Sequence, residues 1–358
     1  MITRIKIEGF KSIEHCDINM RSLNVLIGPN GAGKSNFVSL FKMMQRMFDK
    51  ELQSFISYNG GPDALLFNGR KSTSKLNIET YWGSNGYHFT LEPTVDNRMV
   101  FARECFYWDR SGAYPIGSGH YESLFDKGTR TGIDRYVVPE IRKWKVFHFH
   151  DTSDSSLMKQ MHNLNDNISL SSDARNLAPF LLLLREKYRP SYDDIIEAIR
   201  RVAPFFGEFV LREDPYAKGK IQLEWKSRGT DIVFNASQLS DGTLRFICLA
   251  TLLLQPSVFR ARTIVIDEPE LGLHPFAIKD LAALLKKASG GSQQIIISTQ
   301  SVDLLNEFDP ENIIVVEREN NATILRTVDN EQLKQWLDND YSLGELWNKN
   351  LLGGRPKR

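Results

Sequence analysis

The segment at residues 28–35 constrains the fold more than any other part of the sequence. It reads Gly-Pro-Asn-Gly-Ala-Gly-Lys-Ser, a complete G-x-x-x-x-G-K-S, and it lies between an apolar run at 23–27 and a helical pattern from residue 37 onward. Glycines allow the backbone N–H groups of such a loop to turn inward around phosphate groups, and the following helix adds the positive end of its dipole. The segment therefore predicts a strand, a phosphate-binding loop and a helix.

Two side chains of this loop have predicted roles. Lys34 is expected to reach the β- and γ-phosphates of a nucleotide, and the hydroxyl of Ser35 is expected to ligate Mg²⁺. The alternative, an ordinary glycine turn before a helix, does not require all the fixed positions of the pattern together with these flanks. We therefore expect a nucleotide site.

An acidic pair follows a second apolar run. Residues 263–269 read Thr-Ile-Val-Ile-Asp-Glu-Pro, which predicts a buried parallel strand with two carboxylates at its carboxyl end, where α/β proteins bind their ligands. Asp267 can hold the Mg²⁺ shell, and Glu268 can polarise the water that attacks the γ-phosphorus. Taken alone, the segment could be a solvated turn and helix cap; beside a phosphate loop, the catalytic interpretation is favoured.

A third motif precedes an apolar helix. Residues 238–245 read Gln-Leu-Ser-Asp-Gly-Thr-Leu-Arg. Ser240 and Gly242 at a helix N-terminus offer a hydroxyl, free N–H groups and the positive end of a dipole. A plain helix cap is the alternative, and the other two motifs favour a phosphate-facing role.

Hydrophobic periodicity predicts the rest of the fold. Residues 75–150 are typical of short antiparallel strands, and 157–201 has helical periodicity. A hairpin is expected to join 209–212 to 220–225. From residue 240 helices alternate with buried strands, which predicts an α/β fold with a largely parallel sheet.

Composition excludes several classes of protein. The chain has 358 residues, with 45 Lys and Arg against 44 Asp and Glu, so it does not hold nucleic acid by bulk positive charge, although a local basic patch is compatible with this balance. Three dispersed cysteines indicate neither a disulfide scaffold nor a zinc site. The longest apolar runs, 177–184 and 246–254, are less than half of the ~20 residues that span a bilayer. We expect a cytoplasmic protein with no membrane partner.

The combined motifs are similar to those of ABC-type ATPases of the RecF/SMC/OLD group, often placed among the AAA-type ATPases. Five segments carry the resemblance, in the family's order: GFKS at 9–12, GPNGAGKSN at 28–36, LSDGT at 239–243, VIDEPELGLHP at 265–275 and ISTQS at 297–301. The resemblance implies an α/β fold, an ABC-type P-loop ATPase head with an antiparallel β-rich lobe and a helical insertion lobe. It also implies ATP hydrolysis, with ATP and Mg²⁺ as ligands.

For this family the resemblance implies a dimer around two ATP molecules, in which each phosphate loop faces the LSDGT segment of the other subunit. Ser240 and Gly242 would act in trans, Glu268 would be the catalytic base, and 270–275 would couple the two sites. Asp241, between the two, is also an implied nucleotide-binding position. The other implied nucleotide-binding positions are Lys11, Ser12, Asn30, Gly31, Ala32, Gly33, Lys34, Ser35 and Asn36, with Ser35 and Asp267 on the metal.

The sequence departs from the family pattern at two motifs. The signature usually reads LSGGQ, whereas Asp241 and Thr243 are typical of a divergent branch that includes RecF- and OLD-like defence ATPases. The family's switch histidine is replaced by Gln300, which can hydrogen-bond a phosphate or a water but cannot carry a proton charge. We therefore count Gln300 as a catalytic position and expect slow hydrolysis. Gln53 is a candidate for the family's Q-loop glutamine by order alone.

Four parts are expected along the chain. They are an N-terminal ATPase lobe with the β-rich subdomain (1–150), a helical lobe with the hairpin (151–235), a C-terminal ATPase lobe (236–328) and a helical tail (329–358). The residues after the last predicted head strand are too few for the TOPRIM nuclease domain of full-length OLD-like nucleases.

The leading hypothesis is the oligomeric ATPase and sensor subunit of a prokaryotic antiviral defence system, controlling a separate, nuclease-like (TOPRIM-like) effector. The alternative is a RecF-like clamp that closes on duplex DNA in repair or recombination. A third hypothesis holds that ATP only stabilises an assembly.

Two weaker patterns have open interpretations. His148 and His150 lie on one face of a possible strand, with Asp154 nearby, but no third metal ligand has suitable spacing. A role at a lobe interface or in nucleotide sensing is favoured there over a metal site. The C-terminal segment 341–347 and the basic end at 355–358 could dock a partner or a phosphate backbone, or pack on their own domain.

Overall fold

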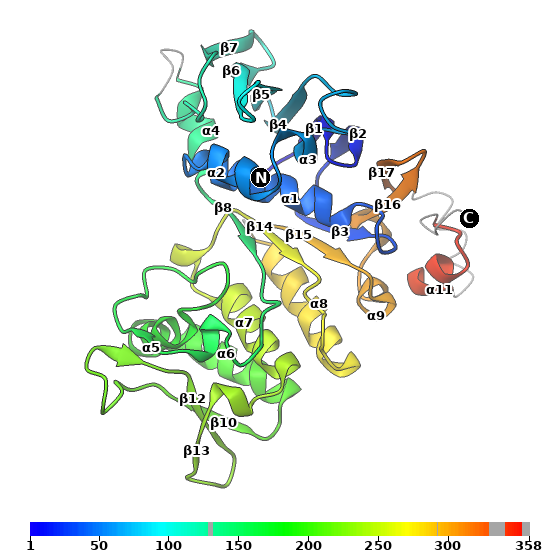
Figure 1. Cartoon of the computed structure of the whole chain (residues 1–358). Coiled ribbons are helices and arrows are strands. Elements are labelled where there is room, and N and C mark those ends of the chain that lie inside the picture. Colours follow the sequence, from blue (N-terminus) through cyan, green and yellow to red (C-terminus); the bar gives the residue numbers. More distant parts are fainter. Residues whose placement is uncertain (128–131, 292, 329–340, 353–358) are drawn as a thin grey trace. The chain divides into compact units, whose positions relative to one another are not determined.

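The computed structural model describes residues 1–127, 132–291, 293–328 and 341–352 (Figure 1). The chain divides into two compact units, each built from segments that are distant in sequence. The first unit comprises residues 1–146, 262–265 and 294–358, and the second comprises 147–261 and 266–293. In the part of the chain that is described, no helix is both long enough and apolar enough to cross a membrane.

An antiparallel sheet of six strands forms one layer of the first unit. Its order is β2-β1-β4-β5-β6-β7, and every neighbouring pair is antiparallel. The prediction of antiparallel strands for residues 75–150 is thus confirmed up to Gly117 and is wrong at Asp134–Ile141, which forms helix α4. Buried residues alternate with more exposed ones along β4, which is typical of a sheet with one face on the core. The strands are β1 (Arg4–Phe10), β2 (Ile13–Asn19), β4 (Leu76–Trp82), β5 (Asn85–Pro93), β6 (Met99–Trp108) and β7 (Gly112–Gly117).

The second sheet has the order β17-β16-β3-β15-β14-β8. The central strand β3 pairs in parallel with β15 and β16, and all five of its residues are buried, as expected for a strand covered on both faces. The last two residues of β14 belong to the second unit. The strands are β3 (Leu23–Ile27), β8 (Trp144–Phe147), β14 (Thr263–Asp267), β15 (Gln294–Thr299), β16 (Ile313–Glu319) and β17 (Ala322–Thr327).

Helix α1 (Lys34–Phe48) lies between these two sheets (Figure 1). One hydrophobic cluster joins Phe37 of α1 to Ile7 of the antiparallel sheet and to Leu26 and Ile296 of the other sheet. Because α1 is buried on more than one side, its first turn is held firmly at the end of β3. Among its described residues, the first unit also contains the helices α2 (Leu52–Tyr58), α3 (Pro62–Leu65), α4 (Asp134–Ile141), α9 (Val302–Asn306) and α11 (Leu343–Asn348), and the 3₁₀ turn Pro310–Asn312.

The predicted C-terminal tail is described only in part. Helix α11 packs against α9: Leu343 and Leu346 are buried, and the N–H of Gly344 donates to Oδ1 of Asn306 at 2.6 Å. This part of the tail packs on its own unit. Residues 329–340 and the basic end at 353–358 lie outside the described residues.

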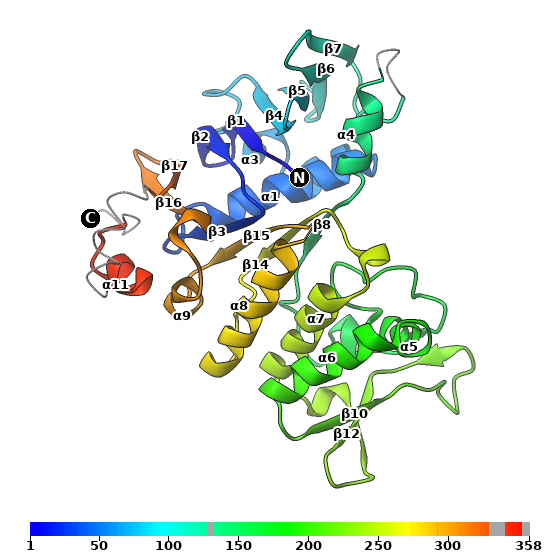
Figure 2. The same ribbon diagram turned by 180° about the vertical axis from the view of Figure 1, so that it is seen from behind.

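The second unit is mainly helical, and α6 packs against both α7 and α8 (Figure 2). Its helices are α5 (Leu177–Lys187), α6 (Arg189–Val202), α7 (Asp241–Leu254) and α8 (Pro275–Ser289), with 3₁₀ turns at Leu157–Lys159, Ala236–Gln238 and Ser257–Phe259. Its short strands are β9 (His162–Asn163), β10 (Phe206–Val210), β11 (Lys220–Ile221), β12 (Glu224–Ser227) and β13 (Val233–Asn235), in sheets ordered β10-β12-β13 and β11-β9.

Two local predictions in this unit need correction. The helical prediction is wrong for 160–176, where buried Asn176 accepts a hydrogen bond from the N–H of Ser171 and donates to the carbonyls of Asp166 and Ser169. Such side-chain bonds compete with helical backbone bonds. The predicted hairpin is correct in part, because β10 pairs with β12 but Lys220–Ile221 pairs with β9 instead.

Candidate functional site

The phosphate loop has the strand-to-helix setting that the sequence predicts. It leaves β3 after Ile27 and enters α1 at Lys34. Gly31 and Gly33 have positive φ angles of 78° and 109°, a region that favours glycine. The side chain of Lys34 is buried, and its Nζ donates to the carbonyl oxygens of Gly28, at 2.6 Å, and Pro29, at 3.1 Å. The ammonium group of Lys34 thus lies against the backbone of the loop.

Neighbouring strands press closely on this loop. A β-carbon at Gly28 would overlap the carbonyl oxygen of Val316 in β16, and a β-carbon at Gly33 would overlap the hydroxyl of Thr323 in β17. Both glycines are therefore required by close packing in addition to any contact with a ligand. The sequence motif gives no sign of Thr323, which lies far from the loop along the chain.

The GFKS segment lies beside the start of α1. Ser12 Oγ accepts from Nδ2 of Asn36 at 2.6 Å, and Nζ of Lys11 donates to Ser39 Oγ at 2.7 Å. Burial lowers the pKa of Lys11, and the nearby charge of Lys42 lowers this pKa further. The structure therefore brings Lys11, Ser12 and Asn36 to the same helix end as the phosphate loop.

Gln300 emerges beside the strand that leads into the loop. Strand β15 is parallel to β3, with Thr299 opposite Ile27, so Gln300 and Gly28 follow their strands at the same level of the sheet. Gln300 is exposed. Ser301, the next residue, caps α9 by accepting a hydrogen bond from the N–H of Leu304 at 3.1 Å.

The LSDGT segment forms the start of α7 in the second unit. Ser240 is the N-cap, and its Oγ accepts from the N–H of Thr243 at 3.2 Å. Ser240 and Asp241 are exposed, so the cap leaves this helix end open to solvent. The helix-cap interpretation is thus present in the structure, and it is compatible with a phosphate-facing role.

A guanidinium group ties this helix start to two other segments. Arg245 donates to the carbonyl oxygens of Phe149 at 3.1 Å, His150 at 2.8 Å and Leu271 at 2.8 Å. Gly242 packs so closely on this region that a β-carbon there would overlap the carbonyl oxygen of Gly272. The signature helix and the loop at 270–274 therefore form one packed block, and sequence reasoning gave Arg245 no role in it.

The acidic pair follows β14. Asp267 ends the strand, and Glu268 has a φ of 42°, a left-handed conformation that is uncommon for a residue with a side chain. The turn is closed by the N–H of Leu271, which donates to the carbonyl of Glu268 at 3.2 Å. His274 then caps α8, with its Nδ1 accepting from the N–H of Phe276 at 3.2 Å.

The predicted site residues are divided between the two units. The second unit contains Ser240, Asp241, Gly242, Asp267 and Glu268. The first unit contains Lys11, Ser12, Asn30, Gly31, Ala32, Gly33, Lys34, Ser35, Asn36 and Gln300.

The side chain of Gln53 hydrogen-bonds to backbone groups of neighbouring segments. Its Nε2 donates to the carbonyl oxygens of Met99 at 2.9 Å and Tyr121 at 2.7 Å, while the carboxylate of Glu122 accepts from the N–H groups of Leu52 and Gln53. The side chain thus joins α2 to β6 and to the loop around residue 121.

The segment with two histidines is not a strand at those positions. Strand β8 ends at Phe147, and the N–H of His148 donates to the carbonyl of Ser172 at 3.0 Å. Across the described ranges, no group of three or more His, Cys, Asp or Glu residues could hold a metal ion. His150 contributes its backbone carbonyl to Arg245.

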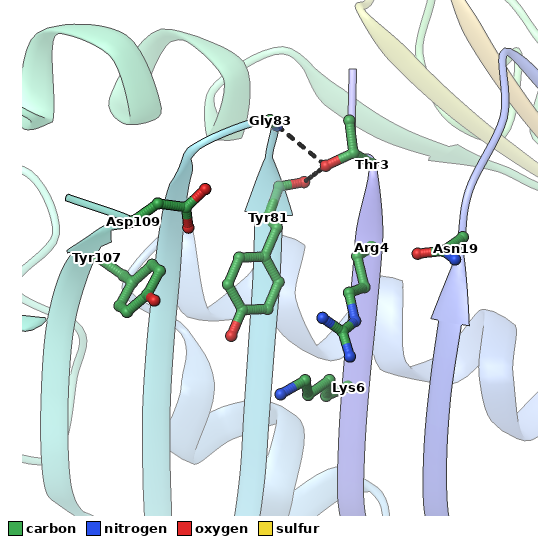
Figure 3. A pocket seen from close by; sticks show the side chains of 8 residues that line it. All are labelled: Thr3, Arg4, Lys6, Asn19, Tyr81, Gly83, Tyr107 and Asp109. Carbon is green, nitrogen blue, oxygen red and sulfur yellow. Dashed lines mark hydrogen bonds between the residues drawn. The ribbon is translucent and has the colours of Figure 1, made fainter. Parts of the chain in front are cut away.

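A shallow pocket of about 330 Å³ lies on the antiparallel sheet (Figure 3). Arg4 and Lys6 lie there beside the ring of Tyr81. Both cations already have acidic partners: Arg4 pairs with Asp17 at 2.5 Å and Lys6 with Glu79 at 3.3 Å. The lining residues are Thr3, Arg4, Lys6, Asn19, Tyr81, Gly83, Tyr107 and Asp109.

Comparison with known proteins gives two family matches and two relatives. A family described as "AAA domain, putative AbiEii toxin, Type IV TA system" matches residues 122–306, and one described as "AAA ATPase domain" matches residues 1–81. The Old nuclease of Escherichia phage P2 is 21% identical over 375 residues, covering 93% of this chain and 62% of that protein. The OLD nuclease of Thermus scotoductus is 21% identical over 390 residues, covering 99% and 68%. The chain thus spans less than two thirds of the phage relative.

Solved structures with a similar fold are heads of SMC proteins. An SMC head bound to the C-terminal winged-helix domain of ScpA has a TM-score of 0.61 at 16% identity, covering 93% of this chain and 99% of that one. An Smc head with an extended coiled coil, bound to the C-terminal domain of ScpA and derived from Pyrococcus furiosus, has a TM-score of 0.60 at 15% identity, covering 95% and 99%. The fold is therefore the mixed α/β fold of an SMC-like ABC ATPase head, as predicted.

The first of these AAA-domain families matches more than half of the chain, and the second matches the segment that contains the phosphate loop. Because ATP binding and hydrolysis define this class of domain, and because the fold agrees with it, the chain belongs to the AAA-domain ATPases and is distantly related to OLD nucleases.

Proposed function

We propose that this protein is an ATP-hydrolysing head that dimerises around ATP and controls a nuclease-like effector in a prokaryotic antiviral defence system. The ATPase part of the proposal is supported by the loop from Gly28 to Ser35, which lies between β3 and α1. The Nζ of Lys34 donates to the carbonyl oxygens of Gly28 and Pro29 in this loop. On nucleotide binding, Lys34 would exchange those carbonyls for the β- and γ-phosphate oxygens, which are stronger acceptors because they are charged.

Mg²⁺ fits the donor atoms that the chain offers. A hydroxyl from Ser35 and a carboxylate from Asp267 are hard oxygen ligands of the kind that Mg²⁺ takes, usually together with waters and substrate phosphates. When bound, the ion would neutralise charge on the β- and γ-phosphate oxygens. The chain's own part is to hold Ser35 at the first turn of α1 and Asp267 at the end of β14.

Other residues of the first unit would complete the nucleotide site. The backbone N–H groups of residues 30–33 would cradle the phosphates. An approaching phosphate would stabilise the protonated form of Lys11, which burial disfavours. Ser12 and Asn36 would support the loop through their mutual hydrogen bond.

Hydrolysis would depend on Glu268 and Gln300. Glu268, held in its left-handed turn, would accept a proton from the attacking water. Gln300, at the end of β15, would hydrogen-bond the γ-phosphate or that water.

In the proposed dimer, the exposed N-terminus of α7 in the second unit would contact the nucleotide that is bound by the other subunit. Ser240 and Asp241 are exposed there, and Leu271 and Phe276 expose apolar surface in the same unit. An exposed N-cap hydroxyl with free N–H groups is suited to a γ-phosphate presented by another subunit.

The assembly test uses the purified chain with Mg²⁺ and a slowly hydrolysed ATP analogue. We expect the mass measured by light scattering to double on adding the analogue, and phosphate release from ATP to be slow but measurable. A mass that stays monomeric at saturating analogue, together with absent phosphate release, would contradict the proposal.

The proposed defence role is supported by the relatives. Two proteins similar to this chain are named as nucleases, and the description of one matching family refers to a toxin–antitoxin system. Isolating the tagged chain from its native host with ATP analogue should recover a nuclease as a stoichiometric partner. Recovery of the chain alone, under conditions that preserve its dimer, would count against a separate effector.

A DNA clamp is the second candidate function, and the pocket on the antiparallel sheet favours it. Arg4 and Lys6 there would exchange their carboxylate partners, Asp17 and Glu79, for phosphates of a duplex backbone (Figure 3). A DNA clamp would bind duplex DNA in an ATP-dependent way without a protein partner. Its affinity for the duplex would fall steeply with salt, because binding releases counterions.

Changing Gln300 to histidine tests the departure at the switch position. We expect faster hydrolysis, by up to roughly 100-fold, because histidine can carry a proton where glutamine cannot. Steady-state phosphate release at saturating ATP measures the change. Gln300→Leu, which removes hydrogen bonding altogether, is the control and should be slower than the native chain. An unchanged or lower rate in Gln300→His would show that Gln300 does not limit turnover.

A further inference from the structure

A buried threonine lies directly behind the phosphate loop. Thr323, in β17, has no exposed surface and belongs to none of the motifs that indicate an ATPase. Its backbone N–H donates to the carbonyl of Ser12 at 2.6 Å, and its hydroxyl donates to the carbonyl of Ala32 at 2.8 Å. The residue therefore contacts two segments that are both more than 280 positions earlier in the chain.

The direction of the hydrogen bonds around Thr323 follows from its single hydroxyl proton. Because that proton goes to the carbonyl of Ala32, Thr323 Oγ1 must accept in its 2.7 Å contact with Ser12 Oγ. Ser12 Oγ in turn accepts from Nδ2 of Asn36 at 2.6 Å. The donors thus form one continuous chain that starts on α1, passes through the turn between β1 and β2, and ends on the phosphate loop.

This chain determines how one peptide group of the loop is turned. In a trans peptide the C=O and the following N–H point in opposite directions. Holding the carbonyl of Ala32 on Thr323 therefore turns the N–H of Gly33 away from β17, as a loop that binds phosphate with its N–H groups requires. None of the described residues has a cis peptide bond, so the peptide between Ala32 and Gly33 is trans.

Steric contact strengthens the same link. Gly33 has a φ of 109°, and a β-carbon at this position would overlap both the hydroxyl and the methyl group of Thr323. The last glycine of the motif is therefore matched to the threonine behind it.

We propose that Thr323 is a positioning residue for nucleotide binding, which holds the phosphate loop in its binding shape before the nucleotide arrives. This inference rests on the proposed function, because it assumes that the loop binds ATP. Thr323 of β17 would orient the peptide between Ala32 and Gly33, and the hydrogen bonds from Asn36 to Ser12 and from Ser12 to Thr323 would hold the threonine in place.

Thr323→Val removes the hydroxyl and keeps the shape, so it leaves the carbonyl of Ala32 without its donor. We expect the affinity for a fluorescent methylanthraniloyl-ATP, titrated with Mg²⁺, to fall by about tenfold or more, as for loss of a buried hydrogen bond. The loss should appear in KM, with kcat at saturating ATP little changed, because a bound nucleotide reorders the loop. Thr323→Ser restores the hydroxyl and should bind within about threefold of the native chain.

Thr80→Val is the matched control. Thr80 is equally buried in the same unit, and its hydroxyl donates to the carbonyl of Tyr87 at 3.0 Å, within the antiparallel sheet. This variant should lose thermal stability as Thr323→Val does, yet keep native affinity for the analogue. Equal weakening in both variants would reduce the effect of Thr323 to general stability and would overturn the inference.

Ser12→Ala gives an independent readout, because it removes the donor to Thr323 without altering β17. We expect weaker binding of the analogue, by a smaller factor than in Thr323→Val. If Thr323→Val does not fold, native affinity in Ser12→Ala overturns the inference. Native affinity in a folded Thr323→Val overturns it as well. A native chain that fails to bind the analogue would instead contradict the proposed function itself.

Discussion

Replacing Lys34 by alanine is expected to abolish measurable nucleotide binding and, with it, any ATP-dependent dimer. The ammonium group of Lys34 is held at the loop by the carbonyls of Gly28 and Pro29, from which it can move to the phosphates. Hydrogen bonds to charged groups contribute about 1.5–3 kcal/mol each, so losing two of them would weaken binding by roughly 10²–10⁴-fold. Isothermal titration calorimetry with an ATP analogue and Mg²⁺ measures the loss.

Lys71→Ala is the control for this experiment, since Lys71 is exposed and belongs to the same unit. It removes the same charge and should leave the affinity unchanged. If Lys34→Ala binds as tightly as Lys71→Ala, then Lys34 has no part in holding the nucleotide.

Changing Glu268 to glutamine should have the opposite combination of effects: ATP binding is kept and hydrolysis is lost. Glutamine has nearly the same shape and can still hydrogen-bond a water, but it cannot accept a proton. We expect phosphate release to fall by roughly 10²–10⁴-fold, as for loss of a general base. The ATP-bound dimer should accumulate, and single-turnover phosphate release combined with light scattering would detect both changes.

Glu197→Gln is the matched control, because Glu197 is a largely exposed carboxylate in the same unit. It should turn over ATP at the native rate. Undiminished turnover in Glu268→Gln would place the catalytic base elsewhere. A loss of ATP affinity in that variant would show that the left-handed turn at residue 268 needs a carboxylate to form.

Regular elements were predictable where their pattern is local. The strands and helices from residue 240 to β16, and the strand-loop-helix at 23–48, are visible in the periodicity of apolar residues, because each buries one face or both. Strand β17 was not predicted. Prediction failed at 160–176, where Asn176 bonds to backbone groups that a helix would have used. It failed partly at Lys220–Ile221, which pairs with β9 although β10 is nearer in sequence.

The arrangement of the chain into units was less predictable than its elements. The predicted C-terminal lobe at 236–328 contributes residues to both units, and its strands β15 and β16 flank β3, near the start of the chain. Pairing between strands so far apart depends on the whole sheet, and a local window of sequence does not contain it.

The sequence alone determined the family and the local structure of three motifs: the glycine-rich turn between β3 and α1, the acidic pair Asp267 and Glu268 after a buried strand, and the capped start of α7. These are properties of short segments, in which glycine positions, apolar runs and cap residues act on their own backbone. Only the tertiary structure revealed Thr323 and Arg245, because their partners lie 291 residues away at Ala32 and 96 residues away at Phe149. A hydrogen bond between residues so far apart in sequence forms only when the chain folds, so no local sequence pattern predicts it.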